Sequence, residues 1–319
     1  MPRKKTKLQI VPRKPPSTSK AEARDERSRE KAPLVSGRWL LFALCATLAA
    51  ACFCGWVGLC LLFWQGSWQL LYHPAAVVTR TPASVGLAFD PVAFAVTDTG
   101  VPRLRGWWIP APQQSSLARF TVIYLHGHDG NLGDTVDALV RLHSVGVNVF
   151  AFDYRGYGES QFVRPSEAHL REDANWAVDY LTGTRRINAG TILLDGTGLG
   201  ANLALEVAAE HPELAGVVVD SPLDDPTSAI FGDSRARLVP ARMLVRDRYD
   251  IDAAAGALRA PLLWLDRADV ANRSGTTQVP ETYKRVAAKK ILVWLNPAED
   301  MNKEAADALS RWLDGLPVR

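Results

Sequence analysis

The stretch Thr191–Ala201, TILLDGTGLGA, decides the fold class of this chain. A short apolar run leads into three closely spaced glycines, and a segment with helical spacing follows. Apolar runs of this kind are typical of strands that are covered on both faces. Glycines permit the tight turn that joins such a strand to a helix. The stretch therefore predicts a strand, a turn and a helix of an α/β protein.

Further apolar runs lie on both sides of this stretch, and helical patterns such as Glu167–Leu181 and Ala201–Glu210 separate the later ones. This alternation predicts a mostly parallel sheet with helices on both faces. We expect eight strands, at Gly86–Val96, Arg103–Trp108, Phe120–Leu125, Asn148–Phe152, Thr191–Leu194, Leu214–Val219, Pro261–Leu265 and Lys290–Leu295.

An uncharged segment of 26 residues, Trp39–Trp64, precedes the sheet. A helix of that length, at about 1.5 Å per residue, crosses a hydrocarbon core of roughly 30 Å. A cleaved signal peptide is the competing interpretation, but its apolar core usually has only about 7–15 residues. We therefore expect one transmembrane helix over 39–64, with the lipid bilayer as its partner.

The charges around this helix predict its orientation. Residues 1–38 hold 12 Lys and Arg against 4 Asp and Glu, and they contain few large apolar residues. Such a composition is typical of a disordered tail, and basic flanks stay in the cytoplasm. We expect a cytoplasmic N-terminus and a folded domain over 65–319 outside the cytoplasm, in the periplasm if the host is a bacterium.

Charge and cysteine usage exclude several classes of function for the folded domain. The net charge of +3 arises in the tail, because the residues after it carry more acidic than basic groups. We therefore expect no nucleic-acid partner. The four cysteines all lie within the apolar segment, so the domain has neither disulfides nor a thiol metal site.

Two polar loops follow consecutive expected strands. They read HGHDGN at 126–131 and DYRGYGES at 153–160. With the glycine turn at 196–200, these motifs resemble the α/β-hydrolase superfamily, especially its esterase, lipase and aminopeptidase-like branch. The resemblance extends from about Tyr72 to Leu316. It implies the α/β-hydrolase fold with a small cap insertion, here at about 223–259.

The same resemblance implies a catalytic triad, and two of its three positions are altered. The nucleophilic serine of the G-x-S-x-G turn is replaced by Gly198. Asp300 occupies the place of the histidine, or Glu299 if the alignment shifts by one. No histidine follows His211. Asp269 matches the acid that orients the histidine in active members.

The oxyanion hole that the resemblance implies is formed by backbone amides, so the altered side chains of the triad do not remove it. The amides of His128 and Leu199 match the oxyanion hole, which binds a developing negative charge. We therefore expect a pseudo-hydrolase that has lost serine-hydrolase activity and acts by binding, scaffolding or regulation on an unknown small-molecule or protein ligand. The alternative is an active esterase, lipase or peptidase that uses an unusual nucleophile or a water molecule.

Two further interpretations concern cofactors. Gly196, Gly198 and Ala201 also match G-x-G-x-x-A, and Asp220 follows about 20 residues later, as in dinucleotide-binding domains. That unit normally opens its domain, whereas here several strands come first. A cation could also be held by polar residues near the ends of the strands, although their spacing matches no metal motif. Those residues are His126, His128, Asp129, Asp269, Glu299 and Asp300. We expect neither a cofactor nor a metal.

The expected cap combines basic and apolar residues. Leu223–Arg259 contains five arginines near its middle, interspersed with Leu, Val and Met. Such a stretch can lie on anionic lipid, face an acidic ligand, or present a solvated helix face.

Overall fold

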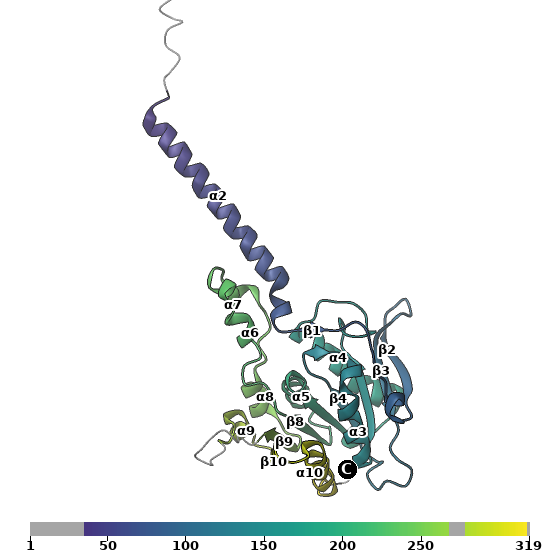
Figure 1. Ribbon diagram of the computed structural model, residues 1–319. Helices are drawn as coiled ribbons and strands as arrows, with labels where there is room; N and C mark the ends of the chain where they lie inside the picture. The colour runs from purple at the N-terminus through teal and green to yellow at the C-terminus, as the bar shows by residue number, and fades with distance from the viewer. Residues whose placement is uncertain (1–34, 268–277, 318–319) are drawn as a thin grey trace, which may run out of the picture. The chain divides into compact units, whose positions relative to one another are not determined.

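The computed structural model describes residues 35–267 and 278–317 (Figure 1). The chain divides into two compact units, one up to Gly58 and one from Leu59 onward. The second unit contains the sheet, the helices around it and the cap.

One sheet of eight strands forms the centre of this unit, in the order β10-β9-β8-β7-β4-β6-β3-β2. The two pairs that β3 forms, with β2 and with β6, are antiparallel, and the pairs from β6 across to β10 are parallel. The eight-stranded, mostly parallel sheet is therefore confirmed. Its strands are β2 (Asp90–Val96), β3 (Pro102–Ile109), β4 (Thr121–Leu125), β6 (Asn148–Asp153), β7 (Ile192–Thr197), β8 (Gly216–Asp220), β9 (Leu262–Arg267) and β10 (Lys290–Leu295).

Helices cover both faces of the sheet, as predicted. Alternation along the buried strands divides the apolar core into two layers, because successive side chains of a strand point to opposite faces. Ile123 of β4 belongs to one core and Val122 to the other. The first core is closed by α4 (Glu167–Asp179), α5 (Leu199–Glu210) and α8 (Ile251–Ala257), and the second by α3 (Val136–Val145) and α10 (Met301–Asp314).

Short elements connect these layers. They are η2 (Pro82–Val85), η3 (Leu132–Thr135), η4 (Tyr180–Thr184), η5 (Ala189–Thr191) and α9 (Glu281–Arg285). A separate pair of two-residue strands, β1 (His73–Pro74) and β5 (Asp129–Gly130), forms a small parallel sheet that no pattern in the sequence predicted.

The insertion after β8 consists of three short helical turns, α6 (Ser228–Phe231), η6 (Ser234–Arg237) and α7 (Ala241–Leu244). The last part of the expected cap range forms α8, which packs against α5 and so belongs to the helical layer. The basic and apolar residues of the cap are therefore spread over separate turns instead of one amphipathic helix.

The apolar segment forms α2 (Gly37–Gly66), which continues into η1 (Ser67–Leu70). This is the one helix in the described part of the chain that is long and apolar enough to cross a membrane. Length and composition alone support this assignment, and they do not determine the orientation of the helix.

Candidate functional site

Gly198 forms the turn between β7 and α5. Its backbone has φ of 56° and ψ of −122°, a conformation that residues with a side chain rarely adopt. The Gly198 amide donates to the carbonyl of Asp220 at 3.0 Å, and its carbonyl accepts from the amide of Ala201 at 3.0 Å. A Cβ atom placed on Gly198 would meet no atom within 4 Å. The turn has room for a side chain that the sequence does not supply.

The neighbouring glycines have a different role, because the chain packs too closely around them for a Cβ atom. A Cβ on Gly196 would lie 2.0 Å from the carbonyl oxygen of Gly200, and one on Gly200 would lie 2.0 Å from that of Leu125. Gly196 and Gly200 therefore let the strand, the helix and the loop after β4 approach one another. This packing accounts for both glycines without a bound nucleotide.

The loop after β4 is fixed by buried side chains. His126 is buried, and its Nδ1 lies 2.9 Å from the carbonyl of Gly127. Burial lowers the pKa of His126 to about 4, so the imidazole is neutral at pH 7. The hydroxyls of Tyr154 and Tyr157 donate to the carbonyls of His126 and His128, at 3.1 and 2.9 Å. This loop is held rigidly beside the Gly198 turn.

The two predicted oxyanion-hole amides belong to this loop and to the first residue of α5. Within residues 35–267 and 278–317, no hydrogen bond uses the amide of His128 or that of Leu199 as a donor. Both N–H groups are therefore available to a ligand. They remain the predicted pair for binding a carbonyl or carboxylate oxygen.

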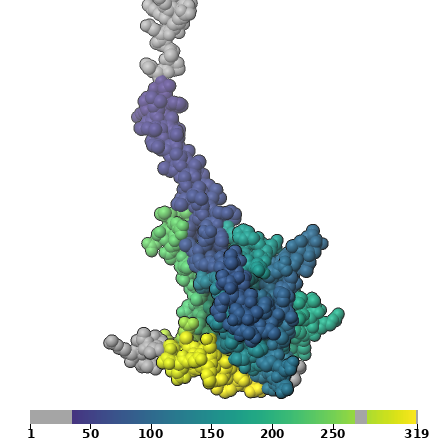
Figure 2. Space-filling model, turned by 45° about the vertical axis from the view of Figure 1, so that its right-hand side comes forward, coloured from purple at the N-terminus to yellow at the C-terminus, as the bar shows by residue number. Residues whose placement is uncertain are grey.

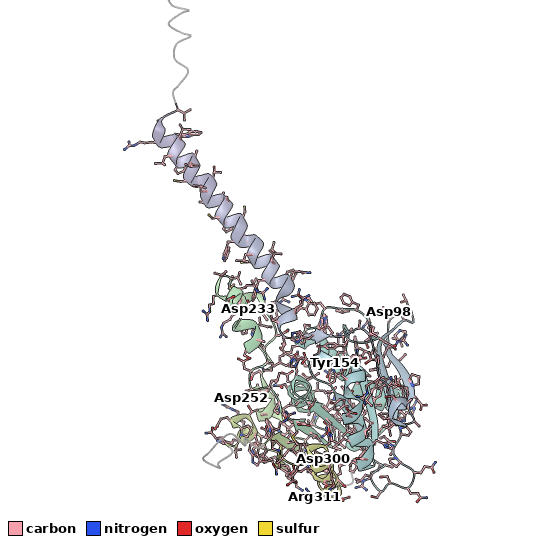
Figure 3. The ribbon with its side chains drawn as sticks, viewed as in Figure 1. Asp98, Tyr154, Asp233, Asp252, Asp300 and Arg311 are labelled. Atoms are coloured by element: carbon pink, nitrogen blue, oxygen red, sulfur yellow. The ribbon has the colours of Figure 1, made fainter. Side chains whose placement is uncertain are left out.

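The predicted base positions follow β10, which is the edge strand of the sheet. Asp300 precedes α10, and its Oδ1 accepts from the amides of Asn302 and Lys303 at 3.1 and 3.2 Å. This carboxylate therefore serves as a helix cap at the protein surface (Figure 3). Glu299 is exposed and accepts from the side chain of Asn296 at 3.3 Å. Asp269 lies outside the described residues.

The candidate cation ligands separate into groups in the structure. His128 and Asp129 come together with His73, which no sequence pattern singled out. Asp129 Oδ1 lies 2.7 Å from His73 Nδ1, and Asp129 Oδ2 lies 3.4 Å from His128 Nε2. One donor atom from each residue fits within 4.8 Å of the others, so these three residues can hold a metal. His126, Glu299 and Asp300 have the other partners described above.

The sequence of this chain is similar to those of known proteins. Residues 117–249 match the family described as serine aminopeptidase, S33. The uncharacterised protein Rv2307c of Mycobacterium tuberculosis is 32% identical over 206 residues, covering 65% of this chain and 70% of that one. The uncharacterised protein YfhR of Salmonella typhi is 32% identical over 195 residues, covering 57% of this chain and 63% of that one.

Solved structures show the same fold. The Pyrococcus furiosus esterase PF2001 covers 77% of this chain and 98% of its own, with a TM-score of 0.57 and 21% identity. An α/β hydrolase from Vibrio vulnificus covers 73% of this chain and 83% of its own, with a TM-score of 0.54 and 21% identity. The chain belongs to the α/β-hydrolase superfamily.

This α/β-hydrolase domain carries a buried group of charges beneath its turn. Asp195 of β7 is fully buried, and among the described residues neither of its carboxylate oxygens has a hydrogen-bond partner. Burial raises the pKa of Asp195 to about 6. Arg141 of α3 is the nearby cation, and its Nη1 lies 3.6 Å from Oδ2 of Asp220. No sequence motif indicates this group, because its members come from three separate elements.

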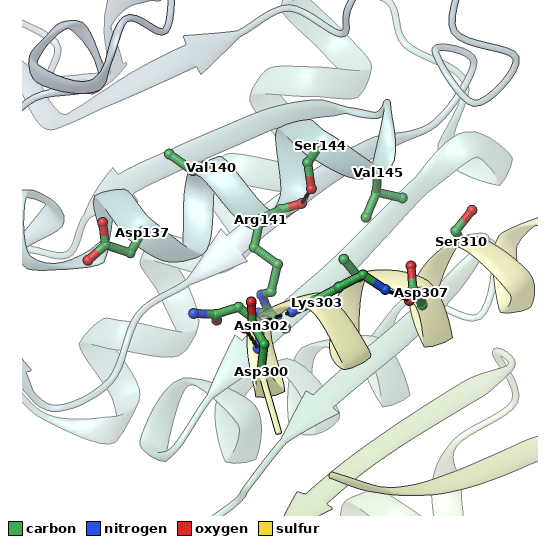
Figure 4. Close-up of a pocket in the computed structure, with 11 residues that line it drawn as sticks. Asp137, Val140, Arg141, Ser144, Val145, Asp300, Asn302, Lys303, Asp307 and Ser310 are labelled. Atoms are coloured by element: carbon green, nitrogen blue, oxygen red, sulfur yellow. Dashed lines mark hydrogen bonds and ion pairs between the residues drawn. The ribbon is translucent and has the colours of Figure 1, made fainter. Parts of the chain in front are cut away.

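Arg141 also lines a cavity of about 590 Å³ between α3 and α10 (Figure 4). Its side chain extends toward the first turn of α10, where Asn302 and Lys303 lie. Gly198 does not line this cavity. The cavity is therefore separate from the turn that carries the nucleophile in active relatives of this family.

Proposed function

We propose that this α/β-hydrolase-fold protein has no serine-hydrolase activity and acts by binding, scaffolding or regulation. The observation that carries the proposal is Gly198. The turn keeps a backbone with φ of 56°, and it has space for a side chain, but no hydroxyl stands there. Acyl transfer through a covalent intermediate needs a nucleophile at this point.

The surroundings of the turn support the same proposal. A general base must lie within hydrogen-bonding reach of the group that it activates. Asp300 caps α10, and His126 is buried with its Nδ1 directed at a backbone carbonyl. The amides of His128 and Leu199 have no acceptor among the described residues, and they suit a ligand with a carbonyl or carboxylate oxygen. The site fits binding better than covalent catalysis.

The proposed function also includes a location at a membrane. The proposal is that α2 spans the bilayer, with residues 1–38 in the cytoplasm and the hydrolase domain on the opposite side. The apolar length of the helix and the basic residues before it support this orientation. The ligand would then be bound close to the membrane surface that faces away from the cytoplasm.

An active esterase, lipase or peptidase is the second candidate. It is favoured by the two free amides, because an intact oxyanion hole accelerates acyl transfer by itself. In serine proteases, the hole and substrate binding retain roughly 10³–10⁴-fold acceleration after the triad is lost. A water molecule would have to replace the serine as the nucleophile.

A fluorophosphonate probe, which labels activated serines covalently, tests the proposal on the full chain in detergent. We expect no labelling of the wild type and new labelling of the double variant Gly198→Ser, Asp300→His. The matched control is Gly183→Ser, because a Cβ atom placed on Gly183 would also meet no atom within 4 Å. Gly183 lies in η4, outside the turn, so a serine there should stay unlabelled.

Three results would count against the proposal. Labelling of the wild type would show an activated nucleophile elsewhere. A folded double variant without labelling would show that either the alignment of Gly198 and Asp300 with the catalytic positions or the pocket around them is wrong. Hydrolysis of generic esters by the wild type, lost in Asp300→Ala or Asp269→Ala, would favour the second candidate.

A further inference from the structure

A cavity of about 500 Å³ lies where η1 and the end of α2 meet the cap and the start of α4. All of its lining residues belong to the compact unit that begins at Leu59. Trp64 lines it from α2 and Trp68 from η1, Arg164 and Arg171 from the segment around α4, and Arg246 from the cap. Figure 2 shows the green cap beside the blue segment that follows α2. Contacts between η1 and α6 agree with this placement.

We propose that this cavity binds the phosphate-bearing headgroup of an anionic phospholipid, with the start of an acyl chain along its apolar wall. The inference rests on the proposed membrane anchor. It does not depend on whether the Gly198 turn is catalytically inactive.

The charges that face the cavity favour an anion. Two carboxylates also line it, but their oxygens already bond to the protein. Glu167 Oε2 accepts from the amides of Arg248 and Tyr249, the latter at 3.1 Å. Asp247 accepts from the hydroxyl of Tyr72 at 2.7 Å and from the amide of Glu167 at 3.2 Å. These acidic groups are therefore occupied by internal hydrogen bonds.

The arginines that line the cavity have few strong interactions with the rest of the described protein, so their guanidinium groups can bind a ligand. Arg246 is exposed and makes no ion pair within the described parts of the chain. The guanidinium of Arg171 lies 3.7 Å from Glu210, a contact between two half-exposed groups. Arg164 donates to the carbonyl of Trp64 and lies 5.5 Å from the centre of its ring. A phosphate can accept hydrogen bonds from such guanidinium groups, which match its geometry.

The apolar part of the cavity distinguishes a lipid from a free anion. Ile230, Leu244 and Val245 form its aliphatic wall, and the two tryptophans come from the end of α2 and from η1. Tryptophan is enriched where a membrane helix meets the headgroup region. On the cap, Met243, which precedes Leu244 in the sequence, leaves 83% of its surface exposed. Positive charge next to apolar surface, at the end of the proposed membrane helix, suits an amphiphile.

The test measures binding of phosphatidylglycerol to the purified full chain by native mass spectrometry in detergent. The cavity variant is Arg164→Gln, Arg246→Gln. The matched control is Arg237→Gln, Arg242→Gln, which removes the same charge from the same side of the domain outside the cavity. General attraction to anionic lipid, about fivefold per basic residue, falls equally in both. We expect the cavity variant to bind at least about tenfold more weakly than the control.

A further variant and a competitor complete the test. Arg246→Gln alone keeps the Arg164 contacts and should bind roughly threefold more weakly than Arg242→Gln alone, which loses only the general attraction. A folding defect in the double variant therefore does not leave the question open. Equal loss in cavity and control variants would overturn the proposal. So would displacement of the lipid by millimolar inorganic phosphate, which would make free phosphate the ligand. A chain that does not float with vesicles would instead reject the membrane anchor.

Discussion

Two buried arginines show how differently this fold treats charge: Arg155 lies in the loop after β6, and Arg141 lies on α3. Arg155, after β6, donates from Nε to Asp173 at 2.5 Å and from Nη2 to Glu172 at 2.5 Å, and Trp176 lies against its guanidinium. Arg141, on α3, approaches Asp220 only to 3.6 Å, and its Nε has no hydrogen-bond partner in the part of the chain that the structure describes.

The difference distinguishes the loop after β6 from the region below the Gly198 turn. The Arg155 cluster holds the loop after β6 by specific bonds, since the backbone amide of Arg155 also donates to Asp173 at 2.8 Å. The Arg141 cluster lies beneath the turn, and within residues 35–267 and 278–317 it leaves the Asp195 carboxylate without a hydrogen-bond partner. In the Arg155 cluster, the buried guanidinium has carboxylates within hydrogen-bonding distance. In the Arg141 cluster, below Gly198, the cost of burying the charges is poorly compensated.

The largest expected effect is the loss of Asp173. Asp173→Ala leaves the guanidinium of Arg155 buried without its main partner, which in other proteins costs about 3–5 kcal/mol. We expect a decrease of that size in the free energy of unfolding. Guanidinium denaturation of the full chain, followed by tryptophan fluorescence, measures it.

The control for this change is the other partner of Arg155. Glu172 has 50% of its side chain exposed, so Glu172→Gln should cost less than about 1 kcal/mol. Equal losses in the two variants would show that burial does not distinguish the two carboxylates and that the cluster acts through Glu172 as well.

A smaller effect is expected at the turn. Gly198→Ala adds a methyl group where φ is 56°, and no neighbouring atom obstructs it. The cost should come from the backbone alone, about 1–3 kcal/mol. The same denaturation experiment measures it. Gly183→Ala, at a glycine without positive φ and without near neighbours, is the control and should be close to neutral. No loss in Gly198→Ala would mean that the turn relaxes to another conformation.

The sequence predicted the main sheet well because each strand is a local apolar run. The predicted strand Lys290–Leu295 has the same bounds as β10, and the other seven predicted strands overlap their counterparts. The small sheet of β1 and β5 was missed for a physical reason. Two residues carry no periodic signal, and only the tertiary fold pairs His73 with Asp129.

The candidate site was predictable where it depends on spacing. Glycines at 196, 198 and 200 indicate the turn, and the first and last of them are required by close packing. The charged group below the turn was not predictable, because Asp195 sits inside an apolar run and its cation comes from α3. Contacts between distant segments leave no pattern in a single sequence.

The smallest expected effect tests whether Asp195 is truly unpaired. Its pKa rises from 3.8 in the unfolded chain to about 6 in the folded protein, because burial penalises the carboxylate. The folded state therefore binds the proton more tightly. This contribution to stability is complete below about pH 4 and disappears as the pH rises through about 6. Asn cannot ionise, so Asp195→Asn should lose this part of the pH dependence.

The measurement is the free energy of unfolding of both proteins at about pH 5 and about pH 8. Relative to wild type, Asp195→Asn should gain about 1 kcal/mol between these two values. Other groups titrate equally in both proteins, so the difference isolates this carboxyl group. Parallel pH profiles would mean that Arg141 already holds Asp195 as a carboxylate at the lower pH. The buried charges of the two arginine clusters would then be compensated equally well, and the contrast between the two regions would rest on Gly198 alone.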